Sequence, residues 1–273
     1  LCWETGNEVE SPVSWTRTIA HYIKSLDTNH LVMDGYASDV RAEVLNLPDV
    51  DIVTSHFYPG GKKSFAERIR ENAARAKGKK AFIVGEFGFA STPVMKAAVK
   101  AIEDSSASGG LIWSLRFRDR DGGFYWHSES AGGSVMKAYH WPGSVMGQAY
   151  DEIHFMNFVR TNAFAICGLP LLEISVPAPP KLLPIADAAA ISWQGSVGAQ
   201  SYQVERGAEE TNNLNLPGGA AHQIGGKWQI VSSNVDEAFT QYRPQFADEN
   251  VPAGRWYYRV RAKNASGISE PSN

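Results

Sequence analysis

The pattern of apolar and polar positions divides the chain into two parts with different periodicities. Up to about residue 168, short continuous apolar runs alternate with segments in which apolar residues recur every three or four positions. Such runs are typical of strands buried on both faces, and such spacing is typical of amphipathic helices. Because each expected strand is followed by a helix, the pattern predicts an α/β fold with a parallel sheet covered by helices. The expected strands are 1–8, 30–35, 50–59, 80–88 and 109–117, and the expected helices are 11–27, 40–47, 64–77, 93–108 and roughly 148–164.

The second part begins with the proline-rich stretch "SVPAPPKLLP", which cannot be helical. Beyond it, apolar and polar residues alternate with period two in runs separated by turn-like segments, a pattern typical of an antiparallel β-sandwich. We therefore expect an α/β domain over 1–174, a linker over 175–184 and an all-β domain over 185–273. The alternating runs are 189–196, 201–207, 227–233 and 255–264.

Composition narrows the function classes. The formal net charge of −3 over 273 residues provides no basic field for nucleic acid, and no run of eighteen apolar residues suggests a membrane span. Cys2 and Cys167 lack the spacing of a metal site, and whether they pair is left open. Eight Trp and ten Tyr are many for this length. Most are expected in cores, but aromatic faces also stack on sugar rings.

Two expected strands end in a glutamate, Glu8 in "GNE" and Glu86 in "GEFG". The carboxyl ends of parallel strands meet at one edge of a sheet, so both side chains could face one cleft. Two carboxylates across a cleft suit the cleavage of a glycosidic bond, with one as proton donor and the other as nucleophile or base. The alternative for either glutamate alone is a capping or surface residue, but both together in these contexts favour the cleft.

Other polar and aromatic residues follow the same strand ends. In "SHFYP", His56 and Tyr58 point to the same side by period two, next to the strand that carries Glu86. They could donate hydrogen bonds that aim a carboxylate. Asn7 could hydrogen-bond a sugar hydroxyl, and Trp113 could be the floor on which a sugar ring stacks.

The motifs "WETGNE", "DIVTSHFYP", "VGEFG" and "GLIWSL", in this order, resemble the second half of a glycoside hydrolase family 5 enzyme, with the endo-β-mannanases as the nearest likeness. The resemblance covers roughly residues 1–168. It implies strands four to eight of a (β/α)₈ TIM barrel and a retaining double displacement without metal or organic cofactor. It implies Glu8 as acid/base and Glu86 as nucleophile, with Asn7, His56, Tyr58 and Trp113 as substrate-binding or positioning residues. Arg116, Trp126 and His127, in the loop after the last strand, are candidates for outer subsites.

This resemblance carries a departure from the family. If "LCWETGNE" is strand four, strands one to three are absent, and a sheet of five strands has two open edges. We therefore expect an N-terminal segment, separate or undetermined, to complete the barrel. The region after 178 resembles a fibronectin type III module with Trp193 in its core. A spacer role is favoured for it over sugar binding by Trp228 or Trp256.

The leading hypothesis is a secreted endo-β-1,4-mannanase that acts on mannan-type polysaccharides. The alternatives are a β-1,4-glucanase or another β-glycanase of the same family, which would share the catalytic residues. A non-catalytic carbohydrate-binding protein with an incomplete barrel is a further alternative, although it has no need to keep both carboxylates and their supporting residues.

Overall fold

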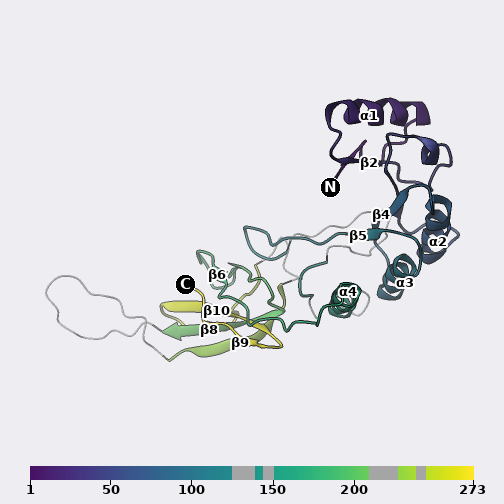
Figure 1. Ribbon diagram of the computed structural model, residues 1–273. Helices are drawn as coiled ribbons and strands as arrows, with labels where there is room; N and C mark the ends of the chain where they lie inside the picture. Colours follow the sequence, from purple (N-terminus) through teal and green to yellow (C-terminus); the bar gives the residue numbers. More distant parts are fainter. Residues whose placement is uncertain (125–138, 144–150, 209–226, 238–243) are drawn as a thin grey trace. The chain divides into compact units, whose positions relative to one another are not determined.

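The computed structural model describes residues 1–124, 139–143, 151–208, 227–237 and 244–273 (Figure 1). These residues fall into two compact units, and each is described by itself. The first unit comprises 1–114, and the second comprises the described residues from 115 onward. The boundaries at 174 and 185 stay predictions.

The first unit is built on one parallel sheet. Its five strands lie side by side in chain order, and every neighbouring pair is parallel, as the sequence predicts. A sheet wound in one direction in this way fits part of a TIM barrel, whereas a doubly wound sheet would reverse its strand order. The strands are β1 (Cys2–Glu4), β2 (Leu31–Asp34), β3 (Ile52–Phe57), β4 (Ala81–Gly88) and β5 (Gly109–Trp113).

The crossover helices pack against one face of this sheet. Consecutive right-handed crossovers place every helix on the same side. Two contacts define that side: the Arg68 guanidinium of α2 lies 4.9 Å from the centre of the Phe57 ring, and Ile102 of α3 lies over Gly110 of β5. The opposite face is the inner face, where a barrel carries its interior side chains. The helices are α1 (Val13–Leu26), α2 (Phe65–Ala76) and α3 (Thr92–Glu103).

The helix expected at 40–47 is much shorter in the structure. Only the 3-10 turn η1 (Val44–Asn46) forms, with Val44 and Leu45 buried. Leu47 leaves the turn in an extended conformation because Pro48 follows it, and a proline disfavours helical backbone in the residue before it. The rest of 36–43 is therefore a loop at the carboxyl end of β2.

The described residues of the second unit form one helix and two antiparallel sheets. Helix α4 (Glu152–Ile166) overlaps the range of roughly 148–164 where the sequence predicts one. One sheet has four strands in the order β11-β10-β8-β9, and the other pairs β6 with β7. The antiparallel prediction for this region is confirmed, while the fibronectin type III likeness stays a prediction. The strands are β6 (Lys181–Leu182), β7 (Trp193–Gln194), β8 (Ser201–Ala208), β9 (Gln229–Val235), β10 (Trp256–Asn264) and β11 (Gly267–Ile268).

The core of these sheets is centred on Trp193, as predicted. Trp193 and Tyr202 are fully buried with their ring centres 5.2 Å apart, and Val204 and Val260 pack in the same cluster. Both cysteines are free thiols. In the described part of the chain, every helix is too short or too polar to cross a membrane.

Helix α2 begins with a reciprocal cap that can be tested. Ser64 Oγ accepts from the Glu67 backbone N–H at 3.3 Å, and Glu67 Oε2 accepts from the Ser64 N–H at 2.8 Å. Ser64→Ala removes half of this capping box and should lower the free energy of unfolding by about 1 kcal/mol, measured by urea denaturation. Ser91→Ala is the matched control, because Ser91 caps α3 without a side-chain hydrogen bond. Equal losses in the two variants would contradict the capping role.

Candidate active site

Three ionisable side chains from different strand ends converge at the carboxyl edge of the parallel sheet. His56 Nδ1 lies 2.8 Å from Oε1 of Glu8 and 3.4 Å from Oε2 of Glu86. One oxygen of each glutamate and this nitrogen lie within 4.8 Å of one another. The structure therefore brings together the two glutamates that the sequence proposed, with the imidazole between them.

A β-bulge in β4 turns Glu86 toward this group. Ser55 pairs with Val84 but His56 pairs with Glu86, so Gly85 is an extra residue relative to β3. The register with β5 shifts between Val84 and Phe87 as well. Side chains in a regular strand alternate between faces, so Glu86 would join Val84 on the helix side without the bulge.

The contacts around β5 show the result of the bulge. A Cβ atom on Gly110 would lie 3.3 Å from Val84 and 3.4 Å from Phe87, and 2.5 Å from Ile102 of α3. Val84 and Phe87 are three positions apart and yet both lie on the helix side. Glu86, between them, is thereby released to the inner face and toward His56.

Gly85 also leaves the space that the imidazole occupies. A Cβ atom at this position would lie 2.2 Å from Oγ1 of Thr54 and 2.8 Å from Nε2 of His56. Both contacts are shorter than real Cβ contacts, so any larger residue would displace these side chains. The extra residue in β4 therefore serves two purposes: it reverses the direction of Glu86, and it admits His56 beside the strand.

Glu8 reaches the site through an unusual backbone. Its φ of 54° is in the left-handed region, which a residue with a Cβ atom adopts at a cost of about 1–3 kcal/mol. The segment before it is held against β2, since a Cβ atom on Gly35 would overlap the carbonyl oxygen of Gly6 at 1.4 Å. The Val9 N–H donates to the Gly35 carbonyl at 3.1 Å on the other side of Glu8. These contacts fix the turn from which Glu8 projects.

The two carboxylates differ in their surroundings. The Glu86 side chain is 14% exposed and accepts a short hydrogen bond from Tyr58 Oη, whereas the Glu8 side chain is 46% exposed. The Tyr58 ring packs against Phe89, with ring centres 5.4 Å apart. Glu86 is thus the inner, tightly held carboxylate, and Glu8 is the outer one that solvent reaches.

Glu4 is a third carboxylate that the sequence analysis did not propose. Trp3 donates to Asp27 on the helix side at 2.9 Å, so its neighbour Glu4 points to the inner face. Partial burial raises the pKa of Glu4; His56 opposes the rise, and the negative charges of Glu86 and Asp34 add to it. Alternation of side chains along "CWE" could have placed Glu4 on the face opposite Trp3. That inference requires knowing which face of the sheet Trp3 occupies.

Trp113 and Asn7 are two further predicted residues. Trp113 is on the strand next to the one that carries Glu86, and Asn7 is next to Glu8 in the sequence. Trp113 ends β5 opposite Gly88, and by alternation from Gly110 it belongs to the inner face with Glu86. The peptide bond after Trp113 is cis. Asn7 is exposed directly before Glu8.

The remaining predicted residues are Arg116, Trp126 and His127. Arg116 belongs to the second unit, where its backbone N–H donates to the Tyr139 carbonyl at 2.8 Å. Trp126 and His127 lie outside the described residues. The outer subsites suggested for these three side chains stay predictions.

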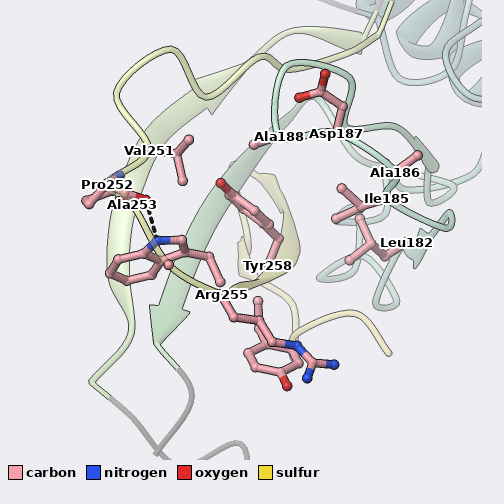
Figure 2. Close-up of a pocket in the computed structure, with 13 residues that line it drawn as sticks. Leu182, Ile185, Ala186, Asp187, Ala188, Val251, Pro252, Ala253, Arg255 and Tyr258 are labelled. Carbon is pink, nitrogen blue, oxygen red and sulfur yellow. Dashed lines mark hydrogen bonds between the residues drawn. The ribbon is translucent and has the colours of Figure 1, made fainter.

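A hollow of about 690 Å³ lies in the second unit (Figure 2). Trp256, one of the two tryptophans suggested for sugar binding, lines it. Its Nε1–H donates to the Pro252 carbonyl, and the Arg206 guanidinium lies 5.0 Å from its ring centre, so the indole already has protein partners. Figure 2 shows Tyr258 in the middle of the lining, with Asp187 and Arg255 on opposite sides of it.

Trp228, the other tryptophan suggested for sugar binding, is half-buried and packs against two neighbouring strands. The backbone of Gly207 lies against the ring, since a Cβ atom there would be 3.1 Å from it. The Arg259 guanidinium lies 4.2 Å from the ring centre. Sugar binding by Trp228 stays a prediction.

Glu8, His56 and Glu86 also have the ligand atoms that a divalent cation would use. In this structure those atoms already contact one another, and Glu86 accepts from Tyr58. A cation would have to replace the His56 hydrogen bonds, so the same three side chains serve either acid–base chemistry or a metal but not both together.

No family model and no curated protein matches the chain. Among solved structures it is similar to the endo-1,4-beta-mannanase from Rhizomucor miehei at 27% identity and a TM-score of 0.33, over 37% of this chain and 36% of that one. It is similar to the endo-1,4-beta-D-mannanase from Thermotoga petrophila RKU-1 at 20% identity and a TM-score of 0.46, over 59% of this chain and 57% of that one. A GH2 beta-galacturonidase from Eisenbergiella tayi is similar at 20% identity and a TM-score of 0.35, over 42% and 25%. The chain spans between a quarter and somewhat more than half of these chains.

The role of Gly85 can be tested by adding one methyl group. Gly85→Ala should lower the free energy of unfolding by about 1–3 kcal/mol, because the new Cβ overlaps Thr54 and His56. It should also move the ring ¹⁵N signals of His56 in an NMR spectrum. Gly109→Ala is the matched control in β5, where a Cβ atom has open space.

The double variant Thr54→Ala, Gly85→Ala separates the two overlaps. It removes the 2.2 Å contact but keeps the one at 2.8 Å from His56. Stability should return in part, while the His56 signals stay shifted. Unchanged His56 signals in both Gly85 variants would mean that this glycine does not set the position of the imidazole.

Proposed function

We propose that this protein is a glycoside hydrolase and that Glu8 and Glu86 are its catalytic pair. The observation that carries the proposal is the placement of two carboxylates and one imidazole within 4.8 Å at the carboxyl edge of a parallel sheet. In sheets of this kind that edge is where active sites are found. Glycosidic bond cleavage requires two carboxyl groups that face each other across the bond.

The different surroundings of the glutamates support different roles. Glu86 is the inner carboxylate, aimed by Tyr58 and approached by His56, which suits a nucleophile that attacks the anomeric carbon. Glu8 is more exposed and shares a hydrogen bond with His56 Nδ1, which suits a group that exchanges protons with the leaving oxygen and then with water. When His56 Nδ1 donates to Glu8, its proton lies between the two catalytic groups.

The reaction would then run in two displacements. Glu8 donates a proton to the glycosidic oxygen while a Glu86 oxygen bonds to the anomeric carbon and the leaving sugar departs. In the second half, Glu8 removes a proton from water, which displaces Glu86 and restores both carboxyl groups. The two steps together retain the configuration of the anomeric carbon.

The separation of the carboxyl groups supports retention over inversion. Retaining enzymes hold the two groups about 5–5.5 Å apart, and inverting enzymes hold them about 6.5–9.5 Å apart to admit a water molecule. One oxygen of Glu8 and one of Glu86 lie within 4.8 Å of each other. Such a close approach of the two side chains favours the arrangement with the shorter separation.

The polymer is proposed from the sequence motifs. The resemblance of "WETGNE" and its companion motifs to endo-β-mannanases supports β-1,4-linked mannan as the substrate, hydrolysed outside the cell. A β-1,4-glucan is the competing substrate, since the catalytic pair is shared. Hydrolysis rates on mannan and on carboxymethyl-cellulose decide between them. Binding of both polymers without hydrolysis would instead favour a carbohydrate-binding protein.

Glu86→Ala should lower kcat on mannan by at least about a thousandfold, while binding of the polymer stays measurable. Added azide should restore part of the rate, because the small anion can attack the anomeric carbon where the carboxylate is missing. The product would be a glycosyl azide of inverted configuration, detected by NMR. Glu10→Ala, which removes an exposed carboxylate two residues beyond Glu8, is the control. A chelator that abolished activity would point to a metal at these residues instead.

Glu8→Gln should slow the reaction according to the leaving group. Substrates with poor leaving groups need proton donation and should lose about 10²–10⁴-fold in rate. Activated aryl mannosides, whose leaving groups depart as anions, should lose far less in the first step. Equal losses on both kinds of substrate, measured in the pre-steady state, would assign the proton donor to another residue.

A further inference from the structure

A second hollow of about 550 Å³ in the first unit has a strongly cationic lining. Five basic side chains line it, from the loops after β2 and β3 and from α2, and we call it the basic pocket. Two carboxylates, Asp39 and Glu71, are among the other lining residues, and so is the ring of Tyr36. The basic residues are Arg41, Lys62, Lys63, Arg68 and Arg75.

The ion pairs of the basic pocket leave part of this charge uncompensated. Glu71 forms an ion pair with Lys63 at 2.5 Å, and Asp39 forms one with Arg68 at 3.0 Å. Arg75 only reaches the same Asp39 at 4.0 Å, and among the described residues Lys62 has no ion pair. Arg41 is compensated by its ion pair with the neighbouring Asp34. Within the residues that the structure describes, the positive charges of Lys62 and Arg75 then remain without a separate carboxylate partner.

Asp39 remains negative and therefore compensates Arg68 at ordinary pH. Its burial would raise the pKa, but hydrogen bonds from Asn72 and Arg68 outweigh burial and lower it. The surplus charge thus does not come from a protonated carboxyl group. It comes from Lys62 and Arg75, which are both exposed.

The walls of the pocket are held firmly in place. The Val40 N–H donates to Oδ1 of the buried Asn72 at 2.7 Å, and Arg41 donates to both oxygens of Asp34 at 3.0 and 3.1 Å. Arg41 Nη1 also donates to the Ser11 carbonyl at 2.6 Å. A cationic surface that only needs solvation would not require such fixation. These bonds instead preorganise the loop that carries Arg41.

The same loop is joined directly to the candidate active site. The backbone N–H of His56 donates to the Ala37 carbonyl at 2.7 Å, and Ser55 Oγ donates to the Ser38 carbonyl at 2.9 Å. The other wall, Gly61 to Lys63, follows Tyr58 by a few residues. The loop that carries Arg41 is therefore linked by hydrogen bonds to β3, the strand that carries His56.

We propose that the basic pocket is a subsite for an anionic group carried by the polysaccharide, so that the preferred substrate is an acidic glycan. This inference rests on the proposed glycoside hydrolase function and names the substrate class of that site. Carboxylate and sulfate share the recognised chemistry, an oxyanion that accepts hydrogen bonds from ammonium and guanidinium groups. Tyr36 also lines the hollow, with the Arg41 guanidinium 4.1 Å from its ring centre.

The test compares three polymers on one backbone: neutral mannan, carboxymethyl mannan and sulfated mannan. The native protein should show a lower KM for the two anionic polymers. The variant Lys62→Gln, Arg75→Gln should reduce the preference, expressed as the ratio of KM values, by about fivefold at low ionic strength. Salt at about 0.5 M should abolish the preference in the native protein, because screening at that concentration acts within a few ångströms. Carboxymethyl mannan and sulfated mannan carry different anionic groups on the same backbone. The polymer with the lower KM therefore shows whether the subsite prefers a carboxylate or a sulfate.

The control variant is Lys77→Gln, Lys79→Gln, which removes the same charge from exposed positions just after α2 that do not line the hollow. It should leave the ratio unchanged. Binding is measured in parallel with the Glu86→Ala variant, so that affinity is read without turnover. Equal affinity for neutral and anionic mannan would overturn the subsite. So would an equal loss of preference in the Lys62→Gln, Arg75→Gln variant and in the control variant.

The two proposals can fail separately. No hydrolysis of any polymer, with anionic mannan still bound through Lys62 and Arg75, would overturn the hydrolase and keep the basic pocket as an anion site. Hydrolysis without a preference for anionic mannan would overturn the subsite alone. Stronger binding of a polyadenylate RNA than of sulfated mannan, lost in the Lys62→Gln, Arg75→Gln variant, would replace the saccharide by nucleic acid and overturn the proposal.

Discussion

The site depends on one extra residue in one strand. The parallel sheet places the ends of its strands at a common edge, but a regular β4 would direct Glu86 toward the helices. The bulge at Gly85 reverses that direction within two residues and keeps Val84 and Phe87 in the outer core. The same glycine lacks the atom that would collide with His56. Backbone geometry therefore decides which face of the sheet carries the chemistry.

The converging charges are arranged around the imidazole. His56 is nearly buried, with 4% of its side chain exposed, and its Nδ1 approaches one oxygen of each glutamate. Without a donor between them, two carboxylates this close would repel each other. Glu4 adds a third negative charge to the inner face, and the rise of its pKa reflects this crowding in part. The site thus combines three carboxyl groups with one imidazole, which can donate a hydrogen bond to either Glu8 or Glu86.

The sequence predicts much of this arrangement, because apolar periodicity and strand order follow from local rules. It predicts the five parallel strands, and it predicts that Glu8 and Glu86 meet, since both are expected at strand ends. In the structure β1 already stops at Glu4, so Glu8 reaches the site from the turn that follows, and Glu86 lies within β4. It does not predict the bulge, because a bulge is defined by the register of β4 against two other strands. For the same reason it associates His56 with Glu86, whereas the shorter contact is to Glu8. The packing of Trp228 depends on Gly207 and Arg259, which only the paired strands bring together.

The order of the strands has a consequence for how the site comes into being. Each strand pairs with the next one along the chain, so the sheet can grow through connections that are short in sequence. Glu8 and Glu86 nevertheless lie on either side of two intervening strands, and each depends on different pairings to reach His56. Glu8 requires β1, β2 and β3 to be paired, whereas Glu86 requires only β3 and β4. The two contacts of the imidazole can therefore form independently, and the three groups come together only when both sets of pairings are complete.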